Sequence, residues 1–144
     1  MKCIVTIDNE HDEEVLVFAR KRTRLVDEIE SLVANGANEI TGYADGEICM
    51  INASDVYCFT VENNKVYAVT ADNKLQIKQR LYQLEEFLGD GFIRVNQSCI
   101  ANIRFISKFS AAFSGALNVT FKNGYSDYVS RRNVKAVKER LGVK

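Results

Sequence analysis

Apolar and polar residues alternate along much of the chain with the two-residue period of half-buried β-strands. At the start of the chain, this pattern predicts strands at residues 3–7 and 15–19. Apolar residues at helical spacing then predict a helix at 23–35, so that the first segments would form a β-β-α element. Two further strands are expected at 38–43 and 47–51, joined by a glycine-containing turn.

The rest of the chain has the pattern of antiparallel hairpins. Asn63 and Asn64 tolerate positive φ and mark one turn, and the pair Asn123-Gly124 is the strongest hairpin signal in the sequence. Ser130 is expected to be the N-cap of a final helix. The predicted strands are 55–61, 66–71, 92–95, 105–109, 117–121 and 125–129, and the predicted helices are 77–88 and 130–141. The fold class is therefore mainly β, with antiparallel sheet and peripheral helices.

Charge is distributed unevenly between two parts of the chain. Residues 1–50 carry five Lys and Arg against eleven Asp and Glu, whereas residues 51–144 carry fourteen against eight. This asymmetry suggests an acidic N-terminal extension at 1–50, which would pack on the core, form a dimer or receive a partner. The basic domain at 51–144 would face a polyanion. Ordinary variation of surface charge explains the numbers equally well.

The sequence offers little for catalysis or cofactor binding. His11 is the only histidine, and the four cysteines have no CxxC pair and no zinc-ligand spacing. Neither a P-loop nor a GxGxxG motif occurs, so no enzyme activity, metal or cofactor is expected. No apolar run approaches the roughly 20 residues that span a bilayer, and the N-terminus lacks the pattern of a signal peptide. A cytoplasmic protein is therefore expected.

Polar and basic side chains gather instead at predicted turns and at a helix start. Arg, Asn and Gln can pair with base edges, and Ser, Lys and helix N-terminal amides suit phosphates. Turn formation, helix capping and a solvated helix face are the alternative explanations of the same residues. The candidates for nucleic-acid contact are Lys65, Asn96, Gln97, Ser98, Arg131, Arg132, Lys135 and Lys138.

Three ordered segments give the chain a specific resemblance to a known family. The segment FIRVNQSCIAN at 92–102 resembles the LytTR pattern in which an aromatic-x-Arg strand runs into a polar triplet with Ser. RLYQLEEFL at 80–88 is similar to the helix that precedes it, and VSRRNVKAVKERLG at 129–142 is similar to the closing strand and helix. The resemblance runs from about residue 53 to residue 141.

This resemblance implies an elongated antiparallel β domain that binds double-stranded DNA through loops. The loops would enter successive major grooves, and the DNA would be bent. By position, Lys65 corresponds to the first base-reading loop, Asn96 and Gln97 to the second, and Arg132 to the third, with Arg131 beside it. Ser98 would contact a phosphate. Many family members carry His where this chain has Asn96 or Gln97, which changes the expected base preference.

The first fifty residues lack the phosphoacceptor pattern of a receiver domain, so the chain resembles the compact LytTR regulators. The resemblance implies a homodimer on repeated half-sites and an integral membrane antagonist as a possible partner. Two other functions stay open: a protein-interaction module that titrates such a partner, and a thiol redox sensor. The second rests on Cys99, which directly follows the polar triplet.

Overall fold

The computed structural model describes residues 1–12, 14–36, 39–89 and 91–142. The chain divides into two compact units, Met1–Val33 and Ala34–Lys144. We call them the N-terminal unit and the β unit. The expected division between residues 50 and 51 falls inside a strand of the β unit. None of the helices in the described ranges is both long and apolar enough to cross a membrane.

The N-terminal unit contains most of the predicted helix but not the predicted strands. Helix α1 spans Arg24–Gly36, and the Thr23 hydroxyl accepts a hydrogen bond from the Val26 N–H at 3.3 Å, which satisfies one amide of its first turn. Residues 1–12 and 14–22 contain no strand. The prediction of strands at 3–7 and 15–19 is therefore wrong for these residues, because alternation supplies a face for burial but not the partner strand that backbone pairing requires.

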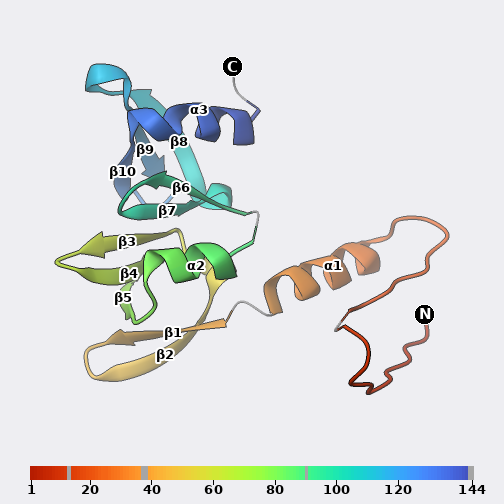
Figure 1. The fold of residues 1–144 in the computed structure, drawn as a ribbon. Coiled ribbons are helices and arrows are strands. Elements are labelled where there is room, and N and C mark those ends of the chain that lie inside the picture. The colour runs from red at the N-terminus through yellow and green to blue at the C-terminus, as the bar shows by residue number, and fades with distance from the viewer. Residues whose placement is uncertain (13, 37–38, 90, 143–144) are drawn as a thin grey trace. The chain divides into compact units, whose positions relative to one another are not determined.

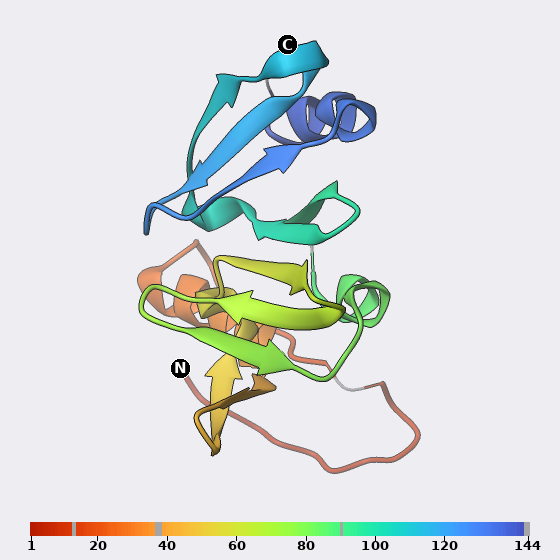
Figure 2. The ribbon, with the colours of Figure 1, turned by 90° about the vertical axis from the view of Figure 1, so that its left-hand side faces the viewer.

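The β unit is built on a seven-stranded antiparallel sheet (Figures 1 and 2). The strand order is β2-β1-β5-β4-β3-β7-β6. The strands are β1 (Glu39–Ala44), β2 (Glu47–Asn52), β3 (Cys58–Glu62), β4 (Lys65–Val69), β5 (Lys74–Ile77), β6 (Phe92–Asn96) and β7 (Cys99–Asn102). Because β1 pairs with β5, β1 and β2 belong to the same sheet as the strands that follow residue 53.

A second sheet and two helices complete this unit. The three-stranded sheet has the order β10-β9-β8, with β8 at Ile106–Ala111, β9 at Leu117–Phe121 and β10 at Ser126–Val129. Helix α2 (Leu81–Phe87) precedes β6, and helix α3 (Arg131–Arg140) follows β10. Single turns of 3-10 helix occur at Ala53–Asp55, Ile103–Phe105 and Phe113–Gly115. The prediction of a mainly β fold with peripheral helices is confirmed.

Three hairpin turns form where the polar residues predicted them. Asn63 and Asn64 have φ of 51° and 64°, which suits a two-residue hairpin turn with the right-handed twist of the strands. Asp45 and Gly46 do the same between β1 and β2. The turn at Asn123-Gly124 is one residue longer, because the Phe121 N–H donates to the Tyr125 carbonyl at 2.8 Å and only Gly124 has positive φ.

The central strands are buried on both faces, which gives the unit two hydrophobic clusters. On β3, Phe59 faces one cluster and Cys58 the other, and both side chains are fully buried. The first cluster is covered by α2 through its Leu81 and Leu84 side chains. The second lies between the large sheet and the three-stranded sheet with α3, and its members include Val95, Val119, Phe121, Val129 and Val137.

Three elements of the β unit differ from the prediction. The helix expected from residue 77 starts at Leu81, because Ile77 is the last residue of β5 and pairs with Val66 of β4. Strands β5 and β7 were not predicted, although β5 pairs with β4 and β1, and β7 pairs with β6 and β3. Each of these strands has only four residues, too few for the sequence alone to show a clear period.

Candidate nucleic-acid interface

Two hairpin turns lie next to each other at one end of the large sheet. Thr60 of β3 pairs with Cys99 of β7, and the Val61 N–H donates to the Ser98 carbonyl at 2.9 Å. The β3–β4 turn at residues 63–64 and the β6–β7 turn at residues 97–98 therefore share one end of the sheet (Figure 1).

The start of α3 joins this end of the sheet through β6. The Ser130 N–H donates to the Val95 carbonyl at 2.9 Å, and the Asn133 side-chain amide donates to the same carbonyl at 3.2 Å. Asn133 also donates to the Ser130 hydroxyl at 2.8 Å, so Ser130 occupies the N-cap position without capping a backbone amide through its side chain. We call the two turns and the N-terminus of α3 the binding edge. It brings together three segments that are far apart in the sequence.

Asn96 lies at this edge but points into the protein. Only 1% of its surface is exposed. Its Nδ2 donates to Asp127 Oδ1 at 3.0 Å and to the Tyr128 carbonyl at 2.8 Å, and its Oδ1 accepts from the Ser98 N–H at 2.7 Å. Both ends of the amide are thus used inside the protein. This geometry argues against direct base contact by Asn96 and assigns it the task of holding the β6–β7 turn against β10.

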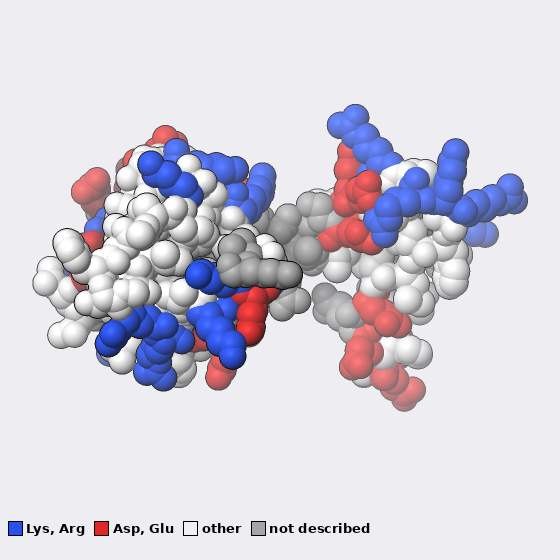
Figure 3. Space-filling model, turned by 90° about the horizontal axis from the view of Figure 1, so that it is seen from above, with Lys and Arg blue, Asp and Glu red and all other residues white. Residues whose placement is uncertain are grey.

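The other seven residues predicted from the sequence present polar groups to solvent. Within the described ranges, the five Lys and Arg among them form no ion pair with a carboxylate, unlike Lys74 with Glu62 and Arg94 with Glu85. Their charges are therefore available to a polyanion. Lys138 is half-buried, and the exposed residues are Lys65, Gln97, Ser98, Arg131, Arg132 and Lys135. Lys and Arg gather in several groups on the face of the β unit in Figure 3, with Asp and Glu between them.

Arg94 is a site residue that the residue-type argument missed. Its Nε donates to Glu85 Oε2 at 3.0 Å, and its NH1 donates to the Gln97 carbonyl at 2.8 Å. Arg94 therefore ties the β6–β7 turn to α2 and fixes the backbone from which Gln97 projects. Its place in the segment 92–102, two residues before the polar triplet, was the available signal.

The two buried thiols of Cys58 and Cys99 lie in the second hydrophobic cluster. Cys58 and Cys99 are fully buried, and the pKa of the Cys99 thiol is raised by its hydrogen bond with Cys58, by burial and by nearby Asp127. Burial also raises the pKa of Tyr125 to about 12. Both groups are therefore neutral near pH 7. In the part of the chain that the structure describes, no group of three or more His, Cys, Asp or Glu side chains is placed to hold a metal ion.

Comparison with known proteins matches the sequence to one family. The family model described as the LytTr DNA-binding domain matches residues 46–142. A relative from Staphylococcus aureus strain NCTC 8325, named as an HTH-type transcriptional regulator, is 36% identical over 141 residues, covering 94% of this chain and 93% of its own. Another relative, from Staphylococcus aureus strain MSSA476 and also named as an HTH-type transcriptional regulator, is 37% identical over 126 residues, covering 83% of this chain and 85% of its own.

A solved structure shares the fold. It is the LytTr DNA-binding domain of a protein from Bacillus cereus that is named as a methyl-accepting/DNA response regulator. The TM-score is 0.69 at 22% identity, over 73% of this chain and 97% of that chain. At this level of identity the match establishes the arrangement of the strands and helices.

Replacing Asn96 with Ala should lower the free energy of unfolding by about 1–3 kcal/mol, because the buried partners of its amide lose their hydrogen bonds. Gln97→Ala, next to it on the surface, should change the free energy by less than about 0.5 kcal/mol. Urea denaturation of both variants measures the difference. If both substitutions lowered the free energy of unfolding equally, Asn96 would not hold the β6–β7 turn in the way that its hydrogen bonds indicate.

The four thiols should differ strongly in their reactivity toward an aromatic disulfide reagent. Exposed Cys3 should react at once, and Cys58 and Cys99 should react only as fast as the protein opens, because the thiolate is the reactive form and these thiols are buried. Mass spectrometry of labelled peptides assigns each rate, and the protein in denaturant is the control in which all four should react alike. Rapid labelling of Cys99 in the native protein would instead favour a redox sensor.

Proposed function

The chain belongs to the LytTR family of DNA-binding domains, and on this basis we propose that it is a transcription regulator that binds specific double-stranded DNA through its binding edge. The observation that carries the proposal is the convergence of two hairpin turns and the start of α3, each with unpaired donors, at one end of the sheet. Because the family is not enzymatic, family membership also agrees with the prediction that the chain is not an enzyme.

The binding edge divides into base-reading and phosphate-binding groups. Gln97 and Arg132 would read bases, since both side chains can make paired hydrogen bonds with base edges in the major groove. Lys65, at the exposed start of β4, would reach into the neighbouring groove. The proposed phosphate contacts are Ser98, Arg131, Lys135 and Lys138, which would make the affinity depend on salt.

Loops rather than a recognition helix carry the readout in this proposal. Among the described residues, α1, α2 and α3 are each separated by strands, so no two α-helices follow one another as a helix-turn-helix requires. The name HTH-type of the relatives therefore does not describe this fold.

Bending of the DNA is part of the proposal. Successive major grooves on one side of a duplex are about 34 Å apart, which is about the full diameter of a globular domain of about 100 residues with a radius of gyration of about 13 Å, so that on a straight duplex only opposite ends of the domain could reach both grooves. Bending toward the protein would bring both grooves within reach of the binding edge. The energy of bending would add sequence preference at base pairs that the protein does not touch.

The N-terminal unit exposes apolar side chains that suit a protein partner. Ile7 is 93% exposed and Phe18 is 92% exposed, and on α1 Leu32 is 71% exposed. We propose that these side chains pack against a second copy of the chain, since a dimer matches repeated half-sites in a promoter. An integral membrane antagonist is the other partner that they could receive. The protein would act in the cytoplasm, where it meets the DNA.

A thiol redox sensor is the weaker candidate function. Cys99 is buried, and its raised pKa keeps it in the unreactive protonated form. We therefore assign Cys58 and Cys99 to the packing of the second cluster.

Arg132→Ala should weaken binding to the protein's own upstream DNA by about 1–3 kcal/mol, because one bidentate base contact is lost. Arg104→Ala is the matched control: Arg104 is also exposed, but it follows the far end of β7, away from the binding edge. Fluorescence anisotropy with the upstream duplex and a scrambled duplex, over a salt series, measures both. Wild-type protein that does not distinguish the two duplexes would refute the proposed function, and equal effects of the two substitutions would remove Arg132 from the site.

Phe18→Ser should shift the full-length chain from dimer to monomer, because the substitution removes an apolar contact between copies. Phe113→Ser is the control, since Phe113 is 95% exposed in the β unit. Sedimentation equilibrium gives the molecular mass of each. A monomeric wild type would contradict the dimer and leave the apolar side chains to another partner.

A further inference from the structure

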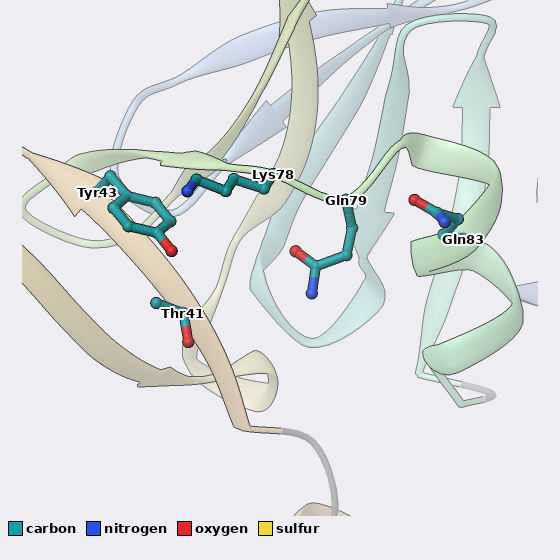
Figure 4. A pocket seen from close by; sticks show the side chains of 5 residues that line it. All are labelled: Thr41, Tyr43, Lys78, Gln79 and Gln83. Atoms are coloured by element: carbon teal, nitrogen blue, oxygen red, sulfur yellow. The ribbon is translucent and has the colours of Figure 1, made fainter.

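The end of the sheet that carries the binding edge continues past β4 onto β5. Val66 of β4 pairs with Ile77, the last residue of β5. Lys78 therefore leaves β5 next to Lys65, where β4 begins. An open pocket of about 320 Å³ lies here, lined by Thr41, Tyr43, Lys78, Gln79 and Gln83 (Figure 4). We call it the Lys78 pocket.

The polar groups of the Lys78 pocket suit an anion. Lys78 Nζ lies 4.6 Å from the centre of the Tyr43 ring and, among the described residues, forms no ion pair with a carboxylate. Gln83 Oε1 accepts a hydrogen bond from the Arg80 N–H at 2.9 Å, which leaves Nε2 to donate. No Asp or Glu is among the lining residues. The pocket thus offers one positive charge and several N–H and O–H donors without a competing carboxylate.

The Tyr43 ring also restricts where the charge of Lys78 can be. A lysine side chain in water samples many rotamers, and each contact that orders it costs conformational entropy. A ring face beneath the ammonium favours one region through the cation–π attraction. The Lys78 charge is thereby held beside the pocket, directly after the strand that pairs with the start of β4.

We propose that the Lys78 pocket binds a phosphate of the DNA backbone at the flank of the sequence that the binding edge reads. This inference rests on the proposed DNA-binding function and extends its contact surface from the two hairpin turns and the start of α3 to β1, the end of β5 and α2. The phosphates of DNA line the two rims of each groove. If the β3–β4 turn with Lys65 enters a groove, a rim phosphate lies beside this turn, close to the Lys78 pocket. The contact positions the duplex and carries no base preference.

The test compares Lys78→Ala with Lys122→Ala. Lys122 is also an exposed lysine, but it lies in the β9–β10 turn, whose Asn123 donates to the Thr70 carbonyl beyond the far end of β4. Lys78→Ala should weaken binding to upstream and scrambled duplexes alike and reduce the slope of log K against log salt by about one. Between about 50 and 200 mM salt, the wild type should lose about 3.5-fold more affinity than Lys78→Ala. Lys122→Ala should keep the wild-type slope.

Substitution of an uncharged residue of the pocket separates the contribution of charge from that of hydrogen bonding. Gln79→Ala should weaken both duplexes while keeping the wild-type salt slope, because it removes a hydrogen bond without removing a charge. Circular dichroism melts establish that both pocket variants are folded.

Duplexes that carry one neutral methylphosphonate at successive backbone positions locate the contact. At one flanking position, the substitution should weaken the wild type and leave Lys78→Ala unaffected. An unchanged salt slope for Lys78→Ala, or equal sensitivity of both proteins at every backbone position, would overturn the Lys78 pocket while the wild type still binds its upstream DNA. Loss of specific binding by the wild type itself is the separate result that refutes the proposed function.

Discussion

The pairing of β3 with β7 is the contact on which the rest of the β unit depends. Phe59 and Ile100 of these strands point into the first cluster, and Cys58 and Cys99 point into the second. Strands buried on both faces cannot slip by one residue, because a slip would exchange the two sets of side chains. The same register sets the Val61–Ser98 hydrogen bond and so places the β3–β4 turn beside the β6–β7 turn. The position of the binding edge therefore follows from core packing.

Hydrogen bonds from side chains and from the backbone then hold the turns and α3 in the positions that the core sets. Asn96 holds the β6–β7 turn from inside, Arg94 holds it from the side of α2, and Ser130 joins α3 to β6. The hydrogen-bond donors of these three residues are used within the protein, whereas the neighbouring side chains of Gln97 and Arg132 are exposed. In the proposed DNA-binding site, this support would reduce the entropy that the loops lose when DNA binds. The residues that position the turns thus lie next to the residues that we propose contact DNA.

Charge and apolar surface are also divided between the two units. The β unit has an excess of Lys and Arg beyond residue 50, although the whole chain has a net charge of zero. The N-terminal unit carries many of the acidic residues together with exposed apolar side chains. Such a composition suits contact with protein better than contact with DNA, in agreement with DNA binding by the β unit and dimer formation by the N-terminal unit, as proposed above.

The sequence by itself determined the antiparallel β class, three of the hairpin turns, the three helices and the family, because turn chemistry, helical spacing and ordered motifs are local. It also identified exposed candidates for DNA contact, such as Lys65 and Arg132. Only the tertiary structure decided that Asn96 is buried while Gln97 is not, that Arg94 supports the turn, and that Lys78 lies beside Lys65. It also decided that residues 3–7 and 15–19 form no strands. The reason is common to all of these: burial and strand pairing depend on residues distant in the chain, and a local pattern carries no information about which partner is present.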